Sequence, residues 1–311
     1  MASRRQFGFK SAFRVIPRYV SSYKDIHSLE YEEVVTETNT CSREDFLCLR
    51  LFQFLIHVLG SELFIEFTRC LDICGLDYAT LADRITRDGD NWTPQWRALL
   101  EAFRQSCKDE LIPADQVKLE FSAEDLRTVD THQLALVPFY MANLVANAAI
   151  ITDLRTYLKE GLGRFFGEKL SGEEMGELET TLDMGLDKIV CYENPLSSKV
   201  VEYEYDLESW LADEGYAPLR DYYLGKAVPF HFQLDDAILS SVEKARSYTS
   251  SMAEAVYRVR INVIGPTGDR IYCYQRNLDP NMPGDVRKRI DKVNEERTIA
   301  RQHAEIASRM S

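Results

Sequence analysis

The sequence is poor in the residues and motifs by which most catalytic centres are recognised. It contains five histidines among 311 residues, and no two of them have the H-x3-H or H-E-x2-H spacing of a zinc site. It has no G-x-S-x-G nucleophile elbow and no Walker phosphate loop. Internal repeats and low-complexity tracts are also absent. The sequence alone therefore assigns no catalytic residue.

Basic residues are in the minority. Lys and Arg number 37 against 50 Asp and Glu, which gives a net charge of -13. Binding to nucleic acids depends on clustered basic side chains, and a strongly negative chain is repelled by phosphates. The charge therefore argues against a nucleic-acid binder, and for the same reason against a protein of anionic membrane surfaces.

The composition is that of a soluble globular protein, with 45% hydrophobic, 28% charged and 11% aromatic residues. The basic N-terminus is not followed by the apolar segment of a signal peptide. The cysteines are odd in number and scattered, which favours a reduced, cytoplasmic protein over a disulfide framework. They are Cys41, Cys48, Cys70, Cys74, Cys107, Cys191 and Cys273.

One long run carries almost no charge. Between Asp130 and Asp153 there is no acidic or basic residue apart from His132, and the run is long enough to cross a bilayer. It also contains a proline, two asparagines and a glutamine, which are costly in lipid. We interpret it as a buried core helix that is bent near Pro138.

The N-terminal segment has the pattern of a β-hairpin. Residues 1–11 are expected to be frayed. Ala12 to Val20 reads as a strand in which Pro17 indicates an edge or a bulge. Glu30 to Thr38 alternates in the manner of a second strand, and a turn between the two predicts antiparallel pairing.

A mainly apolar helix is predicted to follow this hairpin. Ser42 and Asp45 have capping-box spacing, and the apolar run extends from Phe46 to Leu59. His57, near its end, is interpreted as a hydrogen-bonded core residue rather than a metal ligand. Further helix patterns cover residues 61–74, 78–86, 93–110, 122–128, 171–192, 206–213 and 235–246.

The C-terminal part mixes strands and helices. Short strands are predicted over residues 116–121, 199–205 and 228–232, and a hairpin joins Val256 to Ile264 with Arg270 to Arg276. Glycines between Gly161 and Gly167 are expected to end a helix. Pro283 to Met310 predicts a heavily charged helix with a thin apolar seam. The fold class is therefore α+β and mainly α-helical, with a helical body and small β-hairpins near the N- and C-terminal ends.

These patterns suggest three regions. Residues 1–128 would form an N-terminal strand pair with a helical region, and residues 129–282 a helical region with small strands and the C-terminal hairpin. Residues 283–311 would form the charged C-terminal helix.

Three stretches near the N-terminus carry a resemblance to a known family. They are R-V-I-P (Arg14 to Pro17), E-Y-E-E-V-V-T-E-T (Glu30 to Thr38) and T-C-S-R-E-D-F (Thr40 to Phe46). Together they resemble the region after the catalytic barrel of large radical SAM enzymes, in the group that often carries a cobalamin-binding domain. The resemblance is clearest from Ala12 to Cys74. It implies a region that helps to cover the open barrel mouth and to shape the substrate site.

The cluster-binding motif of that family, C-x3-C-x2-C, is not present. Cys70 and Cys74 have its first spacing, but Asp77 stands at the third position. The D-x-H-x-x-G cobalamin signature is incomplete as well, because Glu30 follows Asp25 and His27 where the glycine belongs. The resemblance thus implies S-adenosylmethionine and a [4Fe–4S] cluster only for a full-length or partner protein. No cofactor is expected to bind this chain alone.

A small-molecule pocket is one interpretation of the uncharged run. Asn143 and Asn147 are four residues apart, on one face of the predicted helix, and Tyr140 is nearby. Buried amides need hydrogen-bond partners. These side chains could line a pocket, or they could bond neighbouring backbone groups.

Three hypotheses follow for function. The first is an accessory or C-terminal region of a radical SAM-type enzyme, whose partner is the catalytic domain. The alternative is a non-catalytic helical interaction module that uses the charged helix at residues 283–311. The third is a small-molecule enzyme that uses Tyr140, Asn143 and Asn147. Whether the chain is itself an enzyme stays open, because it carries no catalytic motif.

Overall fold

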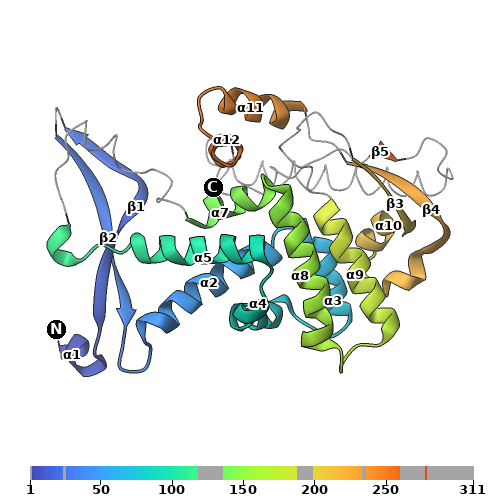
Figure 1. The fold of residues 1–311 in the computed structure, drawn as a ribbon, viewed down its shortest axis with the longest axis horizontal. Helices are drawn as coiled ribbons and strands as arrows, with labels where there is room; N and C mark the ends of the chain where they lie inside the picture. The colour runs from blue at the N-terminus through green and yellow to red at the C-terminus, as the bar shows by residue number, and fades with distance from the viewer. Residues whose placement is uncertain are drawn as a thin grey trace.

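The protein has a mainly helical α+β fold, as the sequence predicts. The structure is a computed structural model, which describes residues 2–23, 26–117, 136–187, 199–232, 236–259 and 277–278. A two-stranded ribbon lies at one end of the molecule, a second small sheet lies at the other, and a body of helices lies between them (Figure 1).

The N-terminal ribbon confirms the predicted hairpin. Strand β1 (Lys10–Tyr23) pairs antiparallel with β2 (Ile26–Glu37). The register shifts between Val15 and Val20, which is the stretch that contains Pro17. Proline has no backbone N–H for the ladder, so the irregularity lies where the sequence predicts it.

The expectation of a frayed N-terminus is wrong, because a short helix, α1 (Ala2–Phe7), precedes the ribbon. The amide N–H of Asn39 donates to the carbonyl of Phe7 at 2.9 Å, which fastens α1 to the turn after β2. Gly8 has a φ of +64°, and a Cβ there would lie 2.0 Å from the Asn39 side chain. Glycine is therefore required for this close approach.

Helix α2 (Arg43–Leu59) begins with the predicted capping box. The N–H of Asp45 donates to Ser42 Oγ at 3.2 Å, and the N–H of Ser42 donates to Asp45 Oδ2 at 2.8 Å. One face is buried in the core, and Phe54 stacks there on Phe103 at 4.6 Å. His57 is not a core residue. Its ring is exposed and its Nδ1 lies 2.9 Å from the carbonyl oxygen of Gln53.

The next helices follow the predicted pattern closely. A 3-10 turn (Glu62–Phe64) leads into α3 (Ile65–Ile73), and α4 (Tyr78–Arg87) and α5 (Pro94–Asp109) follow. Glu66 on α3 is fully buried, although it is an acidic residue.

The N-terminus of α5 has no side-chain cap from its own N-cap residue. Thr93 occupies the N-cap position, but its hydroxyl donates to the carbonyl of Asp153 at 3.0 Å. The Asp153 carboxylate instead accepts the N–H of Gln95. A carboxylate from a neighbouring helix therefore takes the place of the local cap.

The uncharged run forms two helices instead of one. Helix α7 (Leu136–Val145) and helix α8 (Ala148–Phe166) meet at an angle of 92°. The bend is not at Pro138, which lies in the first turn of α7, where proline is tolerated. It lies at Asn147, whose side chain caps α8. Gly161 and Gly163 continue α8, so only Gly167 ends a helix.

The membrane question concerns the same two helices. Among the described residues, no single helix is both long and apolar enough to cross a bilayer, although the bent pair of α7 and α8 reaches that length and composition together.

Helix α9 (Gly172–Asp187) packs against α3 and α8. A Cβ at Gly185 would lie 2.6 Å from the carbonyl oxygen of Leu63, so α9 approaches this backbone closely. Strands β3 (Lys199–Tyr205) and β4 (Tyr223–Phe232) follow as an antiparallel pair, and β5 (Asn277–Leu278) adds to β4. The connection between β3 and β4 contains α10 (Leu207–Ala212) and a 3-10 turn (Leu219–Tyr222).

The last described helices are α11 (Asp236–Arg246) and α12 (Met252–Val259). The strand predicted over Val256 to Ile264 is wrong at residues 256–259, because these residues belong to α12. The N–H of Glu254 donates to Ser251 Oγ at 3.1 Å, a helix-start signal, and Tyr257 packs edge-on against Phe139 of α7.

Several predicted elements lie outside the described residues. These are the segments 122–128, 188–192, 260–276 and 283–311, most of the strand at 116–121, and the boundary at residues 128–129. One hydrophobic core extends from Leu47 on α2 to Tyr257 on α12. The division into three regions remains a prediction.

A half-buried carboxylate, Asp88, fastens the turn between α4 and α5 to α8. Asp88 accepts hydrogen bonds from Tyr157 Oη at 3.0 Å, Arg164 at 2.9 Å and Asn91 at 2.6 Å. Burial raises the pKa of Asp88, but these three donors outweigh it and hold the pKa below its usual value.

Replacing Asp88 by asparagine should destabilise the protein by about 1–3 kcal/mol near neutral pH. A carboxylate whose pKa is depressed on folding stabilises the native state above its unfolded pKa, and this contribution is lost as the pH falls through the folded pKa. The difference between wild type and Asp88→Asn should therefore shrink below about pH 4. Urea unfolding at several pH values measures it.

The matched control is Asp90→Asn, in the same turn, because Asp90 is exposed. It should change the free energy of unfolding little at any pH. An Asp88→Asn difference that is constant down to pH 2–3 would contradict this account, since that range lies about one to two pH units below the usual pKa of aspartate.

Candidate functional site

Tyr140, the first predicted pocket residue, belongs to the hydrophobic core. Its ring packs edge-on against Phe103 at 5.3 Å and Phe54 at 6.4 Å. Its hydroxyl lies 2.8 Å from Ser106 Oγ on α5. Burial raises the pKa of Tyr140, so the phenol stays protonated. This partner satisfies the buried hydroxyl.

The two asparagines lie on different helices and not on one face. Asn143 on α7 donates its Nδ2 to the carbonyl of Phe139 at 2.9 Å. Asn147 accepts the N–H of Ala149 at 3.0 Å and of Ile150 at 3.4 Å. Both amides thus bond neighbouring backbone groups, the second of the two alternatives. A pocket at these residues remains a prediction.

The two cysteines with the radical SAM spacing lie one turn apart on α3 and its C-cap. Cys70 is buried and Cys74 is half-buried. Asp77, at the third position, is the N-cap of α4, and its carboxylate accepts the N–H of Thr80 at 2.7 Å. A helix and two caps thus occupy the stretch that would have to wrap a cluster. Across the described ranges, no three His, Cys, Asp or Glu side chains converge on a metal site.

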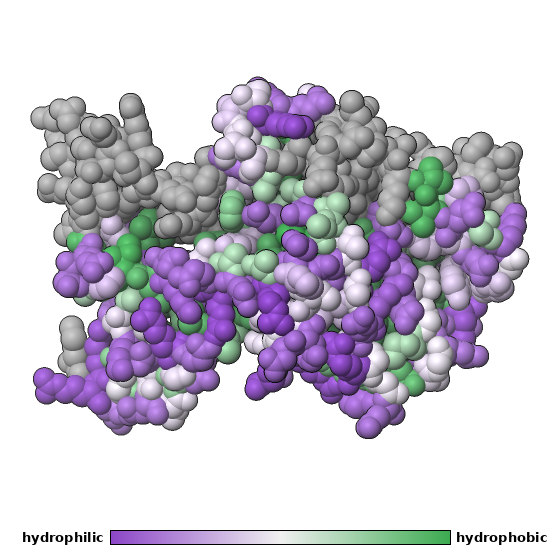
Figure 2. Space-filling model, in the orientation of Figure 1, coloured by the Kyte–Doolittle hydropathy of each residue, from purple (hydrophilic) through white to green (hydrophobic). Residues whose placement is uncertain are grey.

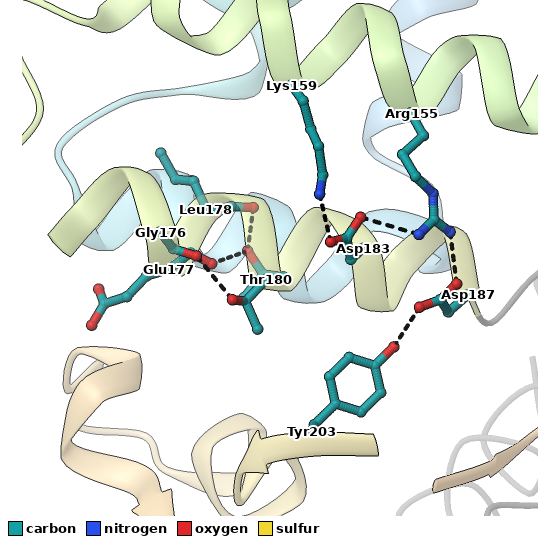
Figure 3. A network of polar contacts seen from close by, with 10 residues as sticks. Arg155, Lys159, Gly176, Glu177, Leu178, Thr180, Asp183, Asp187 and Tyr203 are labelled. Atoms are coloured by element: carbon teal, nitrogen blue, oxygen red, sulfur yellow. Dashed lines mark hydrogen bonds and ion pairs between the residues drawn. The ribbon is translucent and has the colours of Figure 1, made fainter. Parts of the chain in front are cut away.

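A polar network joins α8, α9 and β3 (Figure 3). Arg155 on α8 contacts Asp183 at 3.1 Å and Asp187 at 2.6 Å, both on α9. Lys159, one turn further along α8, contacts Asp183 at 2.7 Å. Two cations spaced by four residues therefore face two carboxylates spaced by four.

Tyr203 completes this network from β3. Its hydroxyl donates to Asp187 Oδ2 at 2.9 Å. Burial, together with the Asp187 carboxylate, raises the pKa of Tyr203, so the phenol remains a donor at neutral pH. Asp187 is therefore held by a guanidinium and a phenol. The arrangement suits the fixing of elements to one another better than acid–base catalysis, which requires a group that titrates near neutral pH.

Sequence reasoning missed this network. The matched spacing of Arg155 with Lys159, and of Asp183 with Asp187, was a usable signal, but it pairs two helices whose contact the sequence does not specify. Tyr203 lies on β3, 16 residues after Asp187, and the connection between α9 and β3 at residues 188–198 lies outside the described part of the chain.

A second network fastens the N-terminal ribbon to the helices. Glu110, after α5, contacts Arg50 on α2 at 2.9 Å and Arg14 on β1 at 3.8 Å. Arg14 also forms an ion pair with Glu32 on β2. The Glu110 side chain is only 9% exposed, and burial raises its pKa, although Arg50 and Arg14 act in the opposite direction.

Backbone hydrogen bonds strengthen the same attachment. The N–H of Phe13 donates to the carbonyl of Ile112 at 2.8 Å, and the N–H of Ile112 donates to the carbonyl of Phe13 at 2.6 Å. The edge of β1 is thus paired with the chain that leaves α5. Side chains and backbone together fix how the ribbon stands on the body.

Comparison with known proteins adds no family to this picture. No protein-family model matches the chain, and no curated protein sequence matches it significantly.

The Figure 3 network yields a paired prediction. Arg155→Met removes the guanidinium that contacts the buried Asp187 carboxylate and should lower the free energy of unfolding by about 3 kcal/mol. Lys159→Met removes a cation from the more exposed Asp183 and should cost less than about 1 kcal/mol. Urea unfolding of both variants tests the difference. Equal losses would show that burial of Asp187 does not set the strength of the network.

Proposed function

We propose that this chain is the accessory, post-barrel region of a radical SAM-type enzyme, and that its ribbon contacts the catalytic barrel. The support is the placement of the three stretches that carry the resemblance. Arg14 to Pro17 lies in β1, Glu30 to Glu37 lies in β2, and Ser42 with Asp45 caps α2. The resembling residues therefore build one continuous feature, the ribbon and its attachment.

The shape of the ribbon favours a docking role. A two-stranded hairpin is only marginally stable in water by itself. Within the described ranges, β1 and β2 form a sheet of two strands, so the outer edge of β2 has no neighbouring strand there. Such an edge can accept a strand of a partner. Hydrophobic side chains gather where the ribbon crosses the end of α5 (Figure 2).

The attachment of the ribbon supports the same role. Glu110, Arg50 and Arg14 hold it at one orientation, so an ordered arm exists before any partner binds. A pre-ordered contact loses less conformational entropy on binding than a flexible one. In this proposal the chain covers the open mouth of the barrel and shapes the substrate site.

The chemistry in this proposal belongs to the barrel. The barrel supplies the [4Fe–4S] cluster and starts a radical reaction by reductive cleavage of S-adenosylmethionine. This chain carries only two thiols at the first spacing of the cluster motif, whereas such clusters need three or four thiolates.

The test is anaerobic isolation of the natural protein from its source cell. The chain should be recovered within a polypeptide larger than 35.8 kDa, or bound to one, that carries C-x3-C-x2-C and shows iron–sulfur absorbance. Recovery of the chain at 35.8 kDa, with no cluster-bearing polypeptide, would refute the proposal.

Matched variants locate the contact when the barrel is supplied as a separate polypeptide. Val35→Glu places a charge on the exposed face of β2, and Val200→Glu places one at a similarly exposed valine on β3. Val35→Glu should reduce recovery of the barrel at least about tenfold, a loss of about 1.4 kcal/mol, while Val200→Glu leaves it unchanged. Loss of the partner on deletion of residues 283–311, with Val35→Glu harmless, would favour the interaction-module alternative.

A further inference from the structure

Two phenylalanines at the foot of the ribbon are exposed. Phe7 ends α1 and is 49% exposed, and Phe9 precedes β1 and is 36% exposed. Their rings stack with centroids 5.8 Å apart. Single exposed apolar side chains are common on proteins, but a stacked pair makes an apolar surface of its own. Residues 7–9 are called the aromatic tip below, and α1, which leads into it, lies at the foot of the ribbon (Figure 1).

Hydrogen bonds hold the aromatic tip in place. The N–H of Phe9 donates to the carbonyl of Arg4 at 3.0 Å, and the N–H of Asn39 donates to the carbonyl of Phe7 at 2.9 Å. Gly8, between the two rings, supplies the positive φ that this turn requires. The two rings are therefore exposed on a turn that the rest of the ribbon fixes.

The aromatic tip lies on the side of the ribbon that faces away from the helical body. Arg4 of α1 forms an ion pair with Glu33 of β2, so α1 lies against the face of the ribbon that carries Glu33. Val35, which is 40% exposed, is two residues further along β2 and shares that face. Glu32 points to the opposite face, where its partner Arg14 contacts the helical body. The aromatic tip and Val35 thus share the outward face of the ribbon.

The charged side chains around the aromatic tip are largely matched within the chain. Arg4 pairs with Glu33, and Lys10 pairs with Glu37 at 2.7 Å. Arg5 adds one further exposed cation. Nucleic acids and anionic bilayers are bound through several unpaired cations, whereas exposed aromatic rings with matched charges around them fit the apolar surface of another protein.

We propose that the aromatic tip is the main apolar anchor of the contact with the catalytic barrel, and that its rings fill an apolar depression on the barrel. This inference rests on the proposed function and adds to it the residues that bind most strongly. A post-barrel region follows its barrel in sequence, so the barrel would lie on the N-terminal side of α1, next to the tip. Aromatic rings that fill a pocket dominate the binding energy of many interfaces, and a fixed turn loses little entropy on docking.

The test compares the oxidation of side chains by hydroxyl radicals in two samples, the natural protein isolated from its source cell and the chain produced alone. Digestion and mass measurement then locate the oxidised residues. Oxidation of Phe7 and Phe9 should be at least about fivefold lower in the natural protein, because a docked anchor is excluded from water. Tyr216 and Tyr248, which are 57% and 66% exposed, are internal controls and should be oxidised equally in both samples.

The anchor and the proposed function fail in different ways. Equal oxidation of Phe7 and Phe9 in both samples, in a natural protein that carries the barrel, would overturn the anchor and leave the proposed function standing. A natural protein of 35.8 kDa with no cluster-bearing polypeptide would overturn both, whatever the oxidation of the tip.

Variants test the anchor directly when the barrel is supplied as a separate polypeptide. Phe7→Ser combined with Phe9→Ser removes both rings from the surface, where they add little to the stability of the chain alone. This double variant should reduce recovery of the barrel at least about tenfold. Tyr248→Ser removes an exposed ring elsewhere and should leave recovery unchanged. Equal recovery by the wild type and the double variant would overturn the anchor.

Discussion

A single buried carboxylate, Glu110, fixes the orientation of the N-terminal ribbon on the helical body. Removing a carboxylate from water is costly unless cations and hydrogen bonds replace the solvent. Arg50 and Arg14 do so, and they come from α2 and β1. Because the carboxylate must be satisfied, the end of α5, the first long helix and the ribbon converge on one point. The neighbouring backbone pairing of Phe13 with Ile112 then follows.

The same physical solution recurs at the opposite end of the body. Asp187 ends the described part of α9, where the negative end of the helix disfavours a carboxylate. Arg155 from α8 and Tyr203 from β3 compensate for it. A β element lies at each end of the helical body (Figure 1). Each is attached through a buried acid, Glu110 for the ribbon and Asp187 for β3. This suits a scaffold that presents surfaces to a partner.

The sequence predicts well those features that depend only on residues within one helical turn of each other, such as helix caps. Ser42 and Asp45 form the capping box that their spacing predicts. The sequence also indicates a bend in the uncharged run but places it at Pro138. The structure has Pro138 in the first turn of α7, where proline fits without a bend. The bend lies at Asn147, whose role as a helix cap the sequence pattern does not reveal. The partners of Asp187 lie far along the chain, so no local pattern specifies them. The positions of Asn143 and Asn147 depend on the same bend. The sequence places both on one helix face, whereas the bend places them on different helices, where each bonds nearby backbone groups.

Native-state hydrogen exchange at the ribbon tests the central claim most directly. The claim is that the body holds the ribbon in place, because a two-stranded hairpin alone would open readily. The amides to follow are those of Phe13 and Arg14 on β1, compared with the interior of α2. The account predicts that they exchange as slowly as those of α2. Rapid exchange of Phe13 and Arg14 while α2 stays protected would contradict it.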